Sequence, residues 1–199
     1  LQEMDVSQQQ IDDAITFLLK HKSVLDPTIA LQVIRGVPSG IPIESVEPDA
    51  HRMAYELWEG KRFRSGVSLE RSKKAMKGYS KEMDIIGQFY RAGIPIVAGT
   101  DNVVPVFSLY LEIESYHKLG KLTPLEAIKT ATIIPAKAMG LDSVTGTLEI
   151  GKEADIAILD KNPLIDISNI RTVSSVITNG NYYESNPLWE AADFKPRNN

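Results

Sequence analysis

The sequence predicts an α/β fold that ends in a small antiparallel β unit. Predicted helices and strands alternate along the first 140 residues, and such an order implies a parallel sheet. The stretch 94–98 is apolar without alternation, which is typical of a parallel strand buried on both faces. After Leu141 the pattern changes to short β segments separated by turns. We therefore divide the chain into an α/β part, a β unit and a tail, which are residues 1–140, 141–183 and 184–199.

The composition excludes several classes of protein. The chain has 199 residues, a formal net charge of −4 and no cysteine. We therefore expect no basic nucleic-acid surface, no disulfide, no thiolate metal ligand and no cysteine nucleophile. No apolar run approaches the roughly 20 residues that a membrane span requires. Position 1 is Leu and no leader-like segment follows it, so we expect the natural N-terminus to be missing and leave the compartment open.

The first predicted helix is followed by the first predicted strand. Ser7 and Gln10 have the spacing of a capping box, and Lys20 suits the C-terminal end of the helix dipole. Residues 23–29 read as a short strand that Pro27 must end or push to an edge.

A long insert, residues 35–68, follows this strand. Glycine and proline punctuate its first half, so we predict a loop there, and then a helix from Pro48 to Gly60. We interpret the basic run 61–64 as a solvated loop. Because the insert leaves the carboxyl end of a strand, we expect it to wall the active site, with a surface decoration as the alternative. The side chains expected to pack downward are Met53, Leu57 and Trp58.

Four helices complete the α/β part. The longest runs from about Ser68 to Ala92, with Gly93 as its C′ residue, and another covers 106–119. The sequence Thr123-Pro124-Leu125-Glu126 is a capping box with proline at the first helical position. A last short helix restarts at Pro135 and closes at Gly140. On the helix 106–119 we expect Leu109, Tyr110 and Ile113 to face inward.

The β unit is predicted from three short segments and a hairpin. The segments are Thr147–Ile150, Ala154–Leu159 and Val173–Thr178. Asn179-Gly180 is the signal of a type I′ turn. We expect the tail from Asn186 onward to be frayed.

Asp101 is the strongest candidate for a functional residue. It lies at the carboxyl end of the buried parallel strand, where α/β proteins bind their ligands. Gly99 lets another group approach the backbone, and Thr100 can orient a carboxylate. A carboxylate in this position can bind a metal ion and accept a proton from water. The alternative is that Asp101 caps the following helix or pairs with a structural cation.

The other polar candidates are weaker. We expect His21, His51 and His117 to be surface or satisfied core residues rather than ligands, because they come from scattered elements. Asp155 lies within an apolar stretch, and a buried carboxylate must be paired, so we expect it to bind nearby backbone donors.

Several motifs resemble the metal-dependent amidohydrolase superfamily. Residues 92–101 (AGIPIVAGTD) resemble its last barrel strand, and residues 122–136 resemble its "LTPxEAIxxAT…PA" helix. Residues 146–164 resemble its strand pair "G.I..GK.ADL.VLD.NPL", and Asn179-Gly180 matches its closing hairpin. Residues 26–29 resemble the "PTL" of the seventh strand in the imidazolonepropionase-like and Xaa-Pro dipeptidase-like branch.

This resemblance implies the C-terminal portion of a (β/α)8 TIM-like barrel, followed by strands of a composite β-sandwich. A complete barrel needs about 250 residues, so this chain holds only its end. The resemblance also implies that Asp101 ligates a divalent metal, usually zinc, and shuttles the proton of the attacking water. The parent enzyme would hydrolyse a C–N bond in an amide, a cyclic amide or a small peptide.

The chain departs from the family pattern in three ways. The family's other ligands, a His-x-His and further histidines and a lysine, have no counterpart here and would lie upstream of Leu1. We therefore expect the chain alone to be inactive. Ile134 stands where the family often has a capping Asn, and Tyr110 stands where many relatives have a His.

The expected partners follow from this interpretation. The parent would take a small-molecule substrate, and neither nucleic acid nor a membrane is expected. A barrel cut to two strands leaves unpaired edges at Val24–Leu25 and Ile94–Ala98. It also exposes apolar positions such as Ile11, so we expect a homo-oligomer. The alternative function is a non-catalytic α/β plus β module for binding or assembly.

Overall fold

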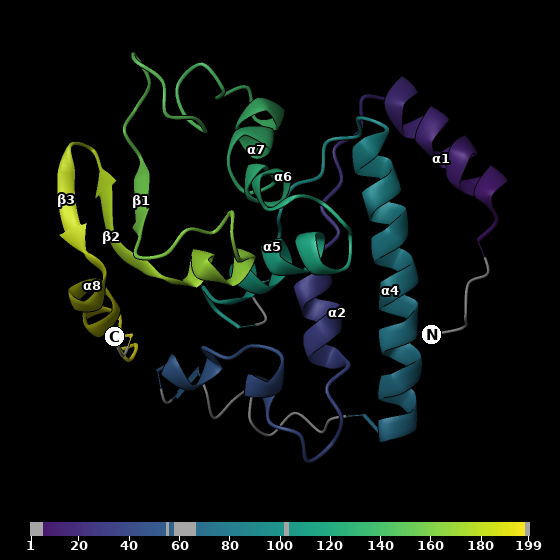
Figure 1. Ribbon diagram of the computed structural model, residues 1–199, viewed down its shortest axis with the longest axis horizontal. Helices are drawn as coiled ribbons and strands as arrows, with labels where there is room; N and C mark the ends of the chain where they lie inside the picture. Colours follow the sequence, from purple (N-terminus) through teal and green to yellow (C-terminus); the bar gives the residue numbers. More distant parts are fainter. Residues whose placement is uncertain (1–5, 55, 58–66, 102–103, 198–199) are drawn as a thin grey trace.

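The computed structural model describes residues 6–54, 56–57, 67–101 and 104–197. Helices α1 and α4 form one side of the molecule, α2 and α5 lie at its centre, and a small sheet forms the opposite side (Figure 1). Among the described residues, no helix is long and apolar enough to cross a membrane. The helices of the α/β part are α1 (Gln8–Lys20), α2 (Ile29–Arg35), α4 (Leu69–Arg91), α5 (Ser108–Lys118), α6 (Pro124–Lys129) and α7 (Ile133–Ala138).

The helix ends follow the predicted signals. Ser7 caps α1 in a complete capping box with Gln10, and Thr123 does the same for α6 with Glu126. The Ser68 side chain accepts a hydrogen bond at the start of α4. Beyond the end of that helix, Gly93 has a φ of +93°, the left-handed conformation expected of a C′ residue.

The two predicted strands of the α/β part form a single parallel bridge. Leu25 pairs with Ile96, the Leu25 amide donates to the Pro95 carbonyl at 3.0 Å, and the Val97 amide donates to the Leu25 carbonyl at 2.9 Å. The predicted parallel pairing is therefore present but short. The predicted strand 23–29 was too long, because α2 begins at Ile29, a helix that the sequence interpretation missed.

The core lies between this bridge and the central helices. Ile29, Met83, Ile94 and Ile96 are fully buried there, together with the ring of Tyr116. On α5, Ile113 faces inward as predicted.

The prediction for Leu109 was wrong, because its side chain is 37% exposed. The helix α5 contacts α2, α6 and the 3-10 helix η3 (Ile167–Arg171), so its buried residues run continuously from Leu111 to Tyr116. Leu109 lies before this enclosed run.

The described part of the insert contains the single-turn helices η1 (Ile43–Ser45) and η2 (Ala50–Arg52), and residues 56–57 are also helical. The single helix that the sequence predicted from Pro48 to Gly60 is therefore interrupted at Met53 and Ala54. Met53 is buried in the core as expected, but Leu57 is 41% exposed, contrary to the prediction. The end of the predicted helix, Trp58 and the basic run 61–64 lie outside the described residues.

The β unit is a three-stranded antiparallel sheet in the order β1-β2-β3. Asn179 and Gly180 both have positive φ, at +49° and +72°, as the predicted type I′ turn requires. The 3-10 helix η3 connects β1 to β2 and buries Ile167 and Ile170 against the α/β core. The strands are β1 (Ile156–Leu159), β2 (Val173–Thr178) and β3 (Asn181–Glu184).

The predicted strand Thr147–Ile150 is wrong, because these residues form turns. Gly146 and Gly151, which flank the segment, both have positive φ, and the Thr147 hydroxyl hydrogen-bonds to the Glu149 carboxylate at 2.8 Å. The side chain of Ile150 is fully exposed. In the described chain, this segment pairs with no neighbouring strand.

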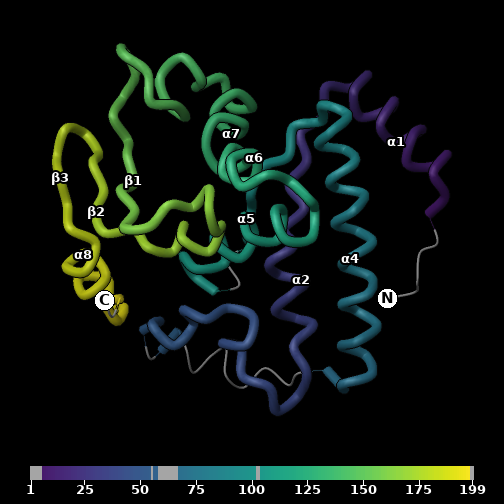
Figure 2. The backbone as a smooth tube through the Cα atoms, viewed as in Figure 1, coloured from purple at the N-terminus to yellow at the C-terminus, as the bar shows by residue number. Residues whose placement is uncertain are grey.

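The tail is ordered, contrary to the prediction that it is frayed. It forms the helix α8 (Ser185–Ala191) and then buries the ring of Phe194. The Lys195 amide donates to the Arg52 carbonyl at 2.8 Å, so the tail returns to the insert. Figure 2 shows this return, with the end of the chain beside the insert at the lower left. Aromatic packing of Trp189 and Phe194 on Phe107 explains the order.

Candidate active site

Two carboxylates follow the bridged strands at their carboxyl ends. Asp26 comes directly after Leu25, and Asp101 comes five residues after Ile96. Asp101 is exposed and has a φ of +47°, a left-handed conformation that is uncommon for a residue with a Cβ. Asp101 therefore follows the carboxyl end of the bridged strand, the side on which α/β proteins in general bind ligands.

Asp26 and Gly99 are in direct contact across the bridge. A Cβ atom at Gly99 would overlap both carboxylate oxygens of Asp26, so only glycine allows this arrangement. No described residue forms a hydrogen bond or ion pair with the exposed Asp26 side chain. The sequence interpretation used Asp26 only as part of a motif and assigned it no role. The signal for its position was Pro27, which ends the strand directly after it.

A buried carboxylate lies beneath these strand ends. Glu112 on α5 is completely buried and accepts hydrogen bonds from the backbone amides of Ile29 at 3.0 Å and Ala30 at 2.6 Å. Thr28, the residue before α2, has a φ of +51° and provides no side-chain cap. Glu112 therefore caps α2 from another helix. The sequence carries no local signal of this contact, because the two elements are far apart along the chain.

The environment of Glu112 disfavours its charged form. Burial raises the pKa of the Glu112 carboxyl, and the negative charge of Asp26 raises it further, although the hydrogen bonds that it accepts act in the opposite direction. The Tyr116 hydroxyl lies 2.7 Å from Glu112 Oε1 and 3.0 Å from the Val97 carbonyl oxygen. One network thus joins α2, α5 and the strand that leads to Asp101.

The three histidines are apart, as expected. The ring of His21 lies 4.4 Å from that of Phe17, His51 Nδ1 is 2.7 Å from the Pro48 carbonyl oxygen, and His117 Nδ1 is 2.7 Å from the Leu122 carbonyl oxygen. The described ranges contain no group of three or more histidine, cysteine, aspartate or glutamate side chains that could hold a metal ion. The residues described here therefore do not form a zinc site by themselves.

Asp155 does not have the position that the sequence predicts. Its side chain is exposed, it lies one residue before β1, and its carboxylate accepts a hydrogen bond from the Thr178 hydroxyl at 2.7 Å. The expectation of a buried carboxylate that binds backbone donors was wrong, because the face of the sheet at this point is open.

The insert is held by a buried cluster around Arg171. This guanidinium contacts Glu47 at 2.5 Å, Asp49 at 3.0 Å and Glu114 at 2.6 Å. Burial raises the pKa of Glu47 to about 6, although Arg171 lowers it in part. The guanidinium also lies 5.4 Å from the ring centroid of Tyr110. The cluster thus joins the insert, α5 and the β unit.

A second contact joins the insert to the turn after Asp101. The Arg52 guanidinium lies 5.2 Å from the ring centroid of Phe107 and 4.9 Å from that of Trp189. Its Nε donates to the Lys195 carbonyl at 3.1 Å. The insert therefore packs beside the segment that follows Asp101.

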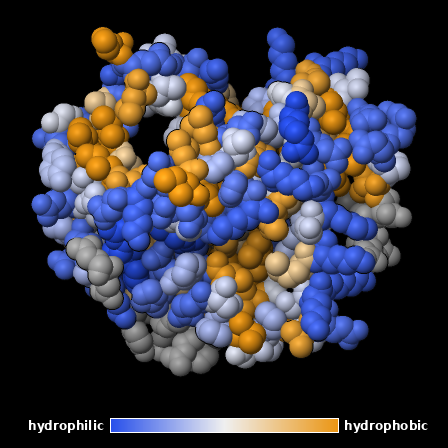
Figure 3. Space-filling view, in the orientation of Figure 1, coloured by the Kyte–Doolittle hydropathy of each residue, from blue (hydrophilic) through white to orange (hydrophobic). Residues whose placement is uncertain are grey.

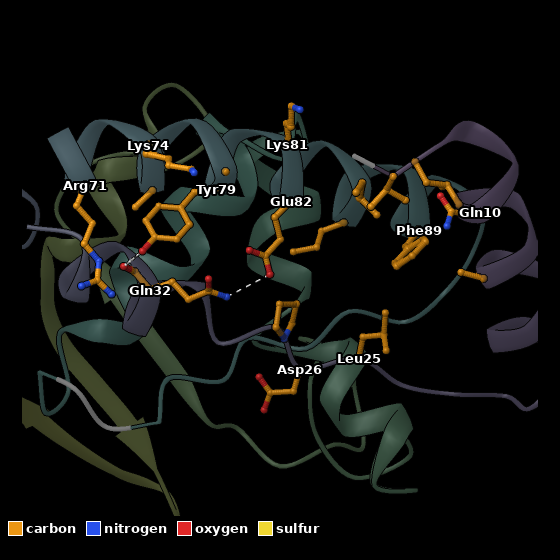
Figure 4. Close-up of a pocket in the computed structure, with 18 residues that line it drawn as sticks. Gln10, Leu25, Asp26, Gln32, Arg71, Lys74, Tyr79, Lys81, Glu82 and Phe89 are labelled. Atoms are coloured by element: carbon orange, nitrogen blue, oxygen red, sulfur yellow. Dashed lines mark hydrogen bonds between the residues drawn. The ribbon is translucent and has the colours of Figure 1, made fainter. Parts of the chain in front are cut away.

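A cleft of about 670 Å³ opens between α1, α4 and the segment 25–27. Figure 4 shows Gln32 Nε2 donating to Glu82, at 3.1 Å, and the Tyr79 hydroxyl donating to the Gln32 carbonyl, at 2.5 Å. Asp26 lies at its margin and points away from α4. Its remaining lining is mostly apolar and carries no catalytic cluster.

The sequence profile of the Amidohydrolase family matches residues 65–182, which is more than half of the chain. The chain belongs to this family. An imidazolonepropionase of Thermoplasma volcanium is 33% identical over 101 residues, which cover 46% of this chain and 24% of that protein. An ochratoxinase of Aspergillus niger is 42% identical over 78 residues, which cover 39% of this chain and 16% of that protein. The chain thus spans less than a quarter of these family members' length.

Solved structures of family members have the same fold. A Xaa-Pro dipeptidase with bound methionine in its active site superposes with a TM-score of 0.58 at 23% identity, over 86% of this chain and 37% of that chain. The Aspergillus niger ochratoxinase gives 0.50 at 31% identity, over 60% of this chain and 28% of that chain. The fold is therefore related to the barrel of the family, which is generally metal-dependent, and the mixed helical part with its three-stranded sheet is consistent with a portion of it.

Proposed function

We propose that the chain is the C-terminal part of a hydrolase that cleaves a C–N bond in an amide, a cyclic amide or a small peptide. The observation that carries this proposal is the placement of Asp101 at the carboxyl end of the paired strands. The names of the similar proteins, imidazolonepropionase, ochratoxinase and Xaa-Pro dipeptidase, support this class of substrate.

Asp101 acts first as a general base and then as a general acid. Its exposed carboxylate accepts a proton from the water that attacks the carbonyl carbon. It then returns this proton to the nitrogen as the C–N bond breaks, so the amine leaves in neutral form. The insert, held against Phe107 through Arg52, forms one wall of the substrate site.

In the longer protein, we propose that Asp101 is also one ligand of a divalent metal ion, zinc in the simplest case. Zinc sites use at least three protein ligands, and the described residues offer no such group. We propose that the remaining ligands lie upstream of Leu1. When bound, the ion would polarise the water or the carbonyl. The isolated chain should accordingly be inactive and should bind zinc weakly.

The decisive experiment compares two aspartate variants of the longer protein. Asp101→Asn should lower kcat/KM for amide or dipeptide substrates by about 10²–10⁴-fold. Asp155→Asn is the matched control, because its carboxylate is exposed and accepts a hydrogen bond from Thr178; its activity should match the wild type. Equal activity of both variants would refute the role of Asp101. A longer protein without hydrolytic activity on any of these substrates would favour the binding or assembly function.

A separate titration tests the isolated chain. After chelator treatment, isothermal titration with zinc should show no stoichiometric binding. Micromolar affinity would mean that a local site uses His21, His51 or His117 and would overturn the ligand assignment.

A further inference from the structure

The Glu112 network is the strongest feature that the proposed hydrolase function leaves unused. Glu112 is completely buried, and among the described residues no lysine, arginine or histidine side chain pairs with it. A buried carboxylate without a counter-ion is strongly disfavoured in its charged form. The titratable groups that face it are Asp26 and Tyr116, and neither supplies a positive charge.

The hydrogen count of the network points to a neutral acid. The Tyr116 hydroxyl has one hydrogen and two oxygen neighbours, the Val97 carbonyl at 3.0 Å and Glu112 Oε1 at 2.7 Å. Both contacts can be hydrogen bonds at the same time only if the tyrosine hydrogen goes to the Val97 carbonyl oxygen, which can only accept. The second contact is then a hydrogen bond only if Glu112 Oε1 carries a hydrogen and donates it to Tyr116. Both Glu112 oxygens can still accept from the amides of Ile29 and Ala30.

We propose that Glu112 is a positioning residue that, as a neutral carboxylic acid, locks the two strand ends of the site together. One end of the network holds the start of α2, two residues after the Asp26-Pro27 pair. The other end holds Val97, two residues before Gly99 and four before Asp101. The contact of Asp26 with Gly99 joins the same two strand ends on their solvent-exposed side.

The consequence for Asp101 rests on the proposed hydrolase function, but the hydrogen-bond network itself does not. A fixed Val97 sets where the following turn begins and thereby where the Asp101 carboxylate is presented. Errors of about 1 Å in such a placement can cost about 10²-fold in rate. Glu112 touches neither substrate nor reacting atoms, so its action is through the backbone.

Infrared spectroscopy of the 199-residue chain tests the protonation state. At pH 7, the wild type should show the carbonyl stretch of a protonated carboxylic acid, and Glu112→Gln should lack it. Tyr116→Phe should shift this band, because the acid loses its acceptor. Tyr79→Phe is the matched control: it removes a hydroxyl that donates to α2, at the Gln32 carbonyl, and should leave the band unchanged. Absence of the band in the wild type would overturn the proposal.

Amide hydrogen exchange tests the lock. In Glu112→Ala, exchange at Ile29 and Ala30 should be about tenfold faster or more, because both amides lose a buried acceptor. Glu112→Gln should retain the protection of Ala30, because the carboxamide oxygen can replace Oε2, but not that of Ile29, because the NH2 group that donates to Tyr116 cannot accept from this amide. Equal loss of protection at Ala30 in the Gln and Ala variants would contradict the proposal. If the Ala variant fails to fold, the infrared comparison of the wild type with Tyr116→Phe still tests whether Glu112 is protonated and donates to Tyr116.

Kinetics of the longer protein test the link to catalysis. Tyr116→Phe should lower kcat by about tenfold with KM within about twofold, while Tyr79→Phe leaves both unchanged. An unchanged kcat in Tyr116→Phe would refute the positioning role. If the longer protein hydrolysed none of these substrates, the proposed hydrolase function would be refuted. The infrared and exchange measurements would still test the hydrogen-bond network of Glu112 independently.

Discussion

The α/β part and the β unit bury their apolar residues to very different degrees. In the α/β part, the bridge residues Leu25 and Ile96 are covered by α2, α4 and α5, and Ile96 is 0% exposed. In the β unit, Ile158 on β1 is 39% exposed and Leu148 before it is 75% exposed. Figure 3 shows apolar side chains gathered on this side, at the upper left over β1 and the segment before it.

The difference shows which region contains its own packing partners. A sheet needs a second layer on its apolar face, and in the described chain η3 contacts β1 while α8 contacts β2 and β3. The α/β part has helices on both sides of its bridge (Figure 1). Sequence patterns describe local structure equally well in both regions, but stability depends on which faces are covered.

Truncation of an apolar side chain should therefore give the largest difference in stability loss between the two regions. Ile96→Ala should lower the free energy of unfolding by about 2–5 kcal/mol, because the side chain is fully buried and leaves a cavity. Ile158→Ala, which removes the same atoms from a half-exposed site, should cost less than about 1 kcal/mol. Urea unfolding monitored by circular dichroism measures both. Equal losses would mean that the face of β1 is covered in solution.

The predictability of the fold follows a different division, between local and long-range contacts. Caps and turns were predicted correctly at Ser7, Thr123 and Asn179 because each signal lies within four residues. The helix α2 was missed because its N-terminus is capped by Glu112 from α5 rather than by a residue beside it. The order of the tail was missed because it depends on Phe107, which is distant in the sequence.

The candidate site was predictable only in part. The apolar strand and the residues that follow it identify Asp101 from local sequence. Asp26 and Glu112 gain their positions through contacts across the fold, and no spacing in the sequence reports such contacts. The cluster around Arg171 was likewise missed, because its carboxylates come from the insert and from α5.

The cluster around Arg171, which joins the two regions, should give the second-largest effect on stability. The effect is a dependence of the free energy of unfolding on pH. The pKa of Glu47 is raised to about 6 in the folded protein, so between about pH 4.5 and 6 the folded state binds more protons than the unfolded state. Stability should therefore fall as the pH rises through this range, by about 2 kcal/mol from this group. Comparing urea unfolding of the wild type and Glu47→Gln at pH 4.5 and 7 isolates this contribution. Parallel pH profiles of the two proteins would contradict it.

Helix capping in the α/β part should give a smaller effect. Thr123→Ala removes a side chain that accepts from the Glu126 amide and should lower stability by about 1 kcal/mol. Thr147→Ala is the control in the β unit, since its hydroxyl contacts Glu149 in an exposed turn; its change should stay within about 0.5 kcal/mol. Thermal unfolding measures both. A larger loss of stability in Thr147→Ala than in Thr123→Ala would contradict the expectation that the α/β part contributes more to stability than the β unit.

The smallest effect on stability should accompany a change in association. The uncovered apolar side chains of the β unit include Leu148, Ile150 and Ile158, and exposed apolar patches and sheet edges promote pairing with another chain. The expectation that Ile11 is exposed was wrong, because its side chain is only 6% exposed. We therefore expect the isolated chain to form a homodimer or higher oligomer at micromolar concentration through the face of the β unit. Ile150→Lys combined with Ile158→Lys should shift light scattering toward the monomer while unfolding under dilute conditions changes little. As the matched control, Phe17→Lys on α1 replaces a 60% exposed ring on the opposite side of the molecule and should leave the oligomer intact. A wild-type chain that is monomeric at these concentrations would show that exposure of this face does not drive self-association.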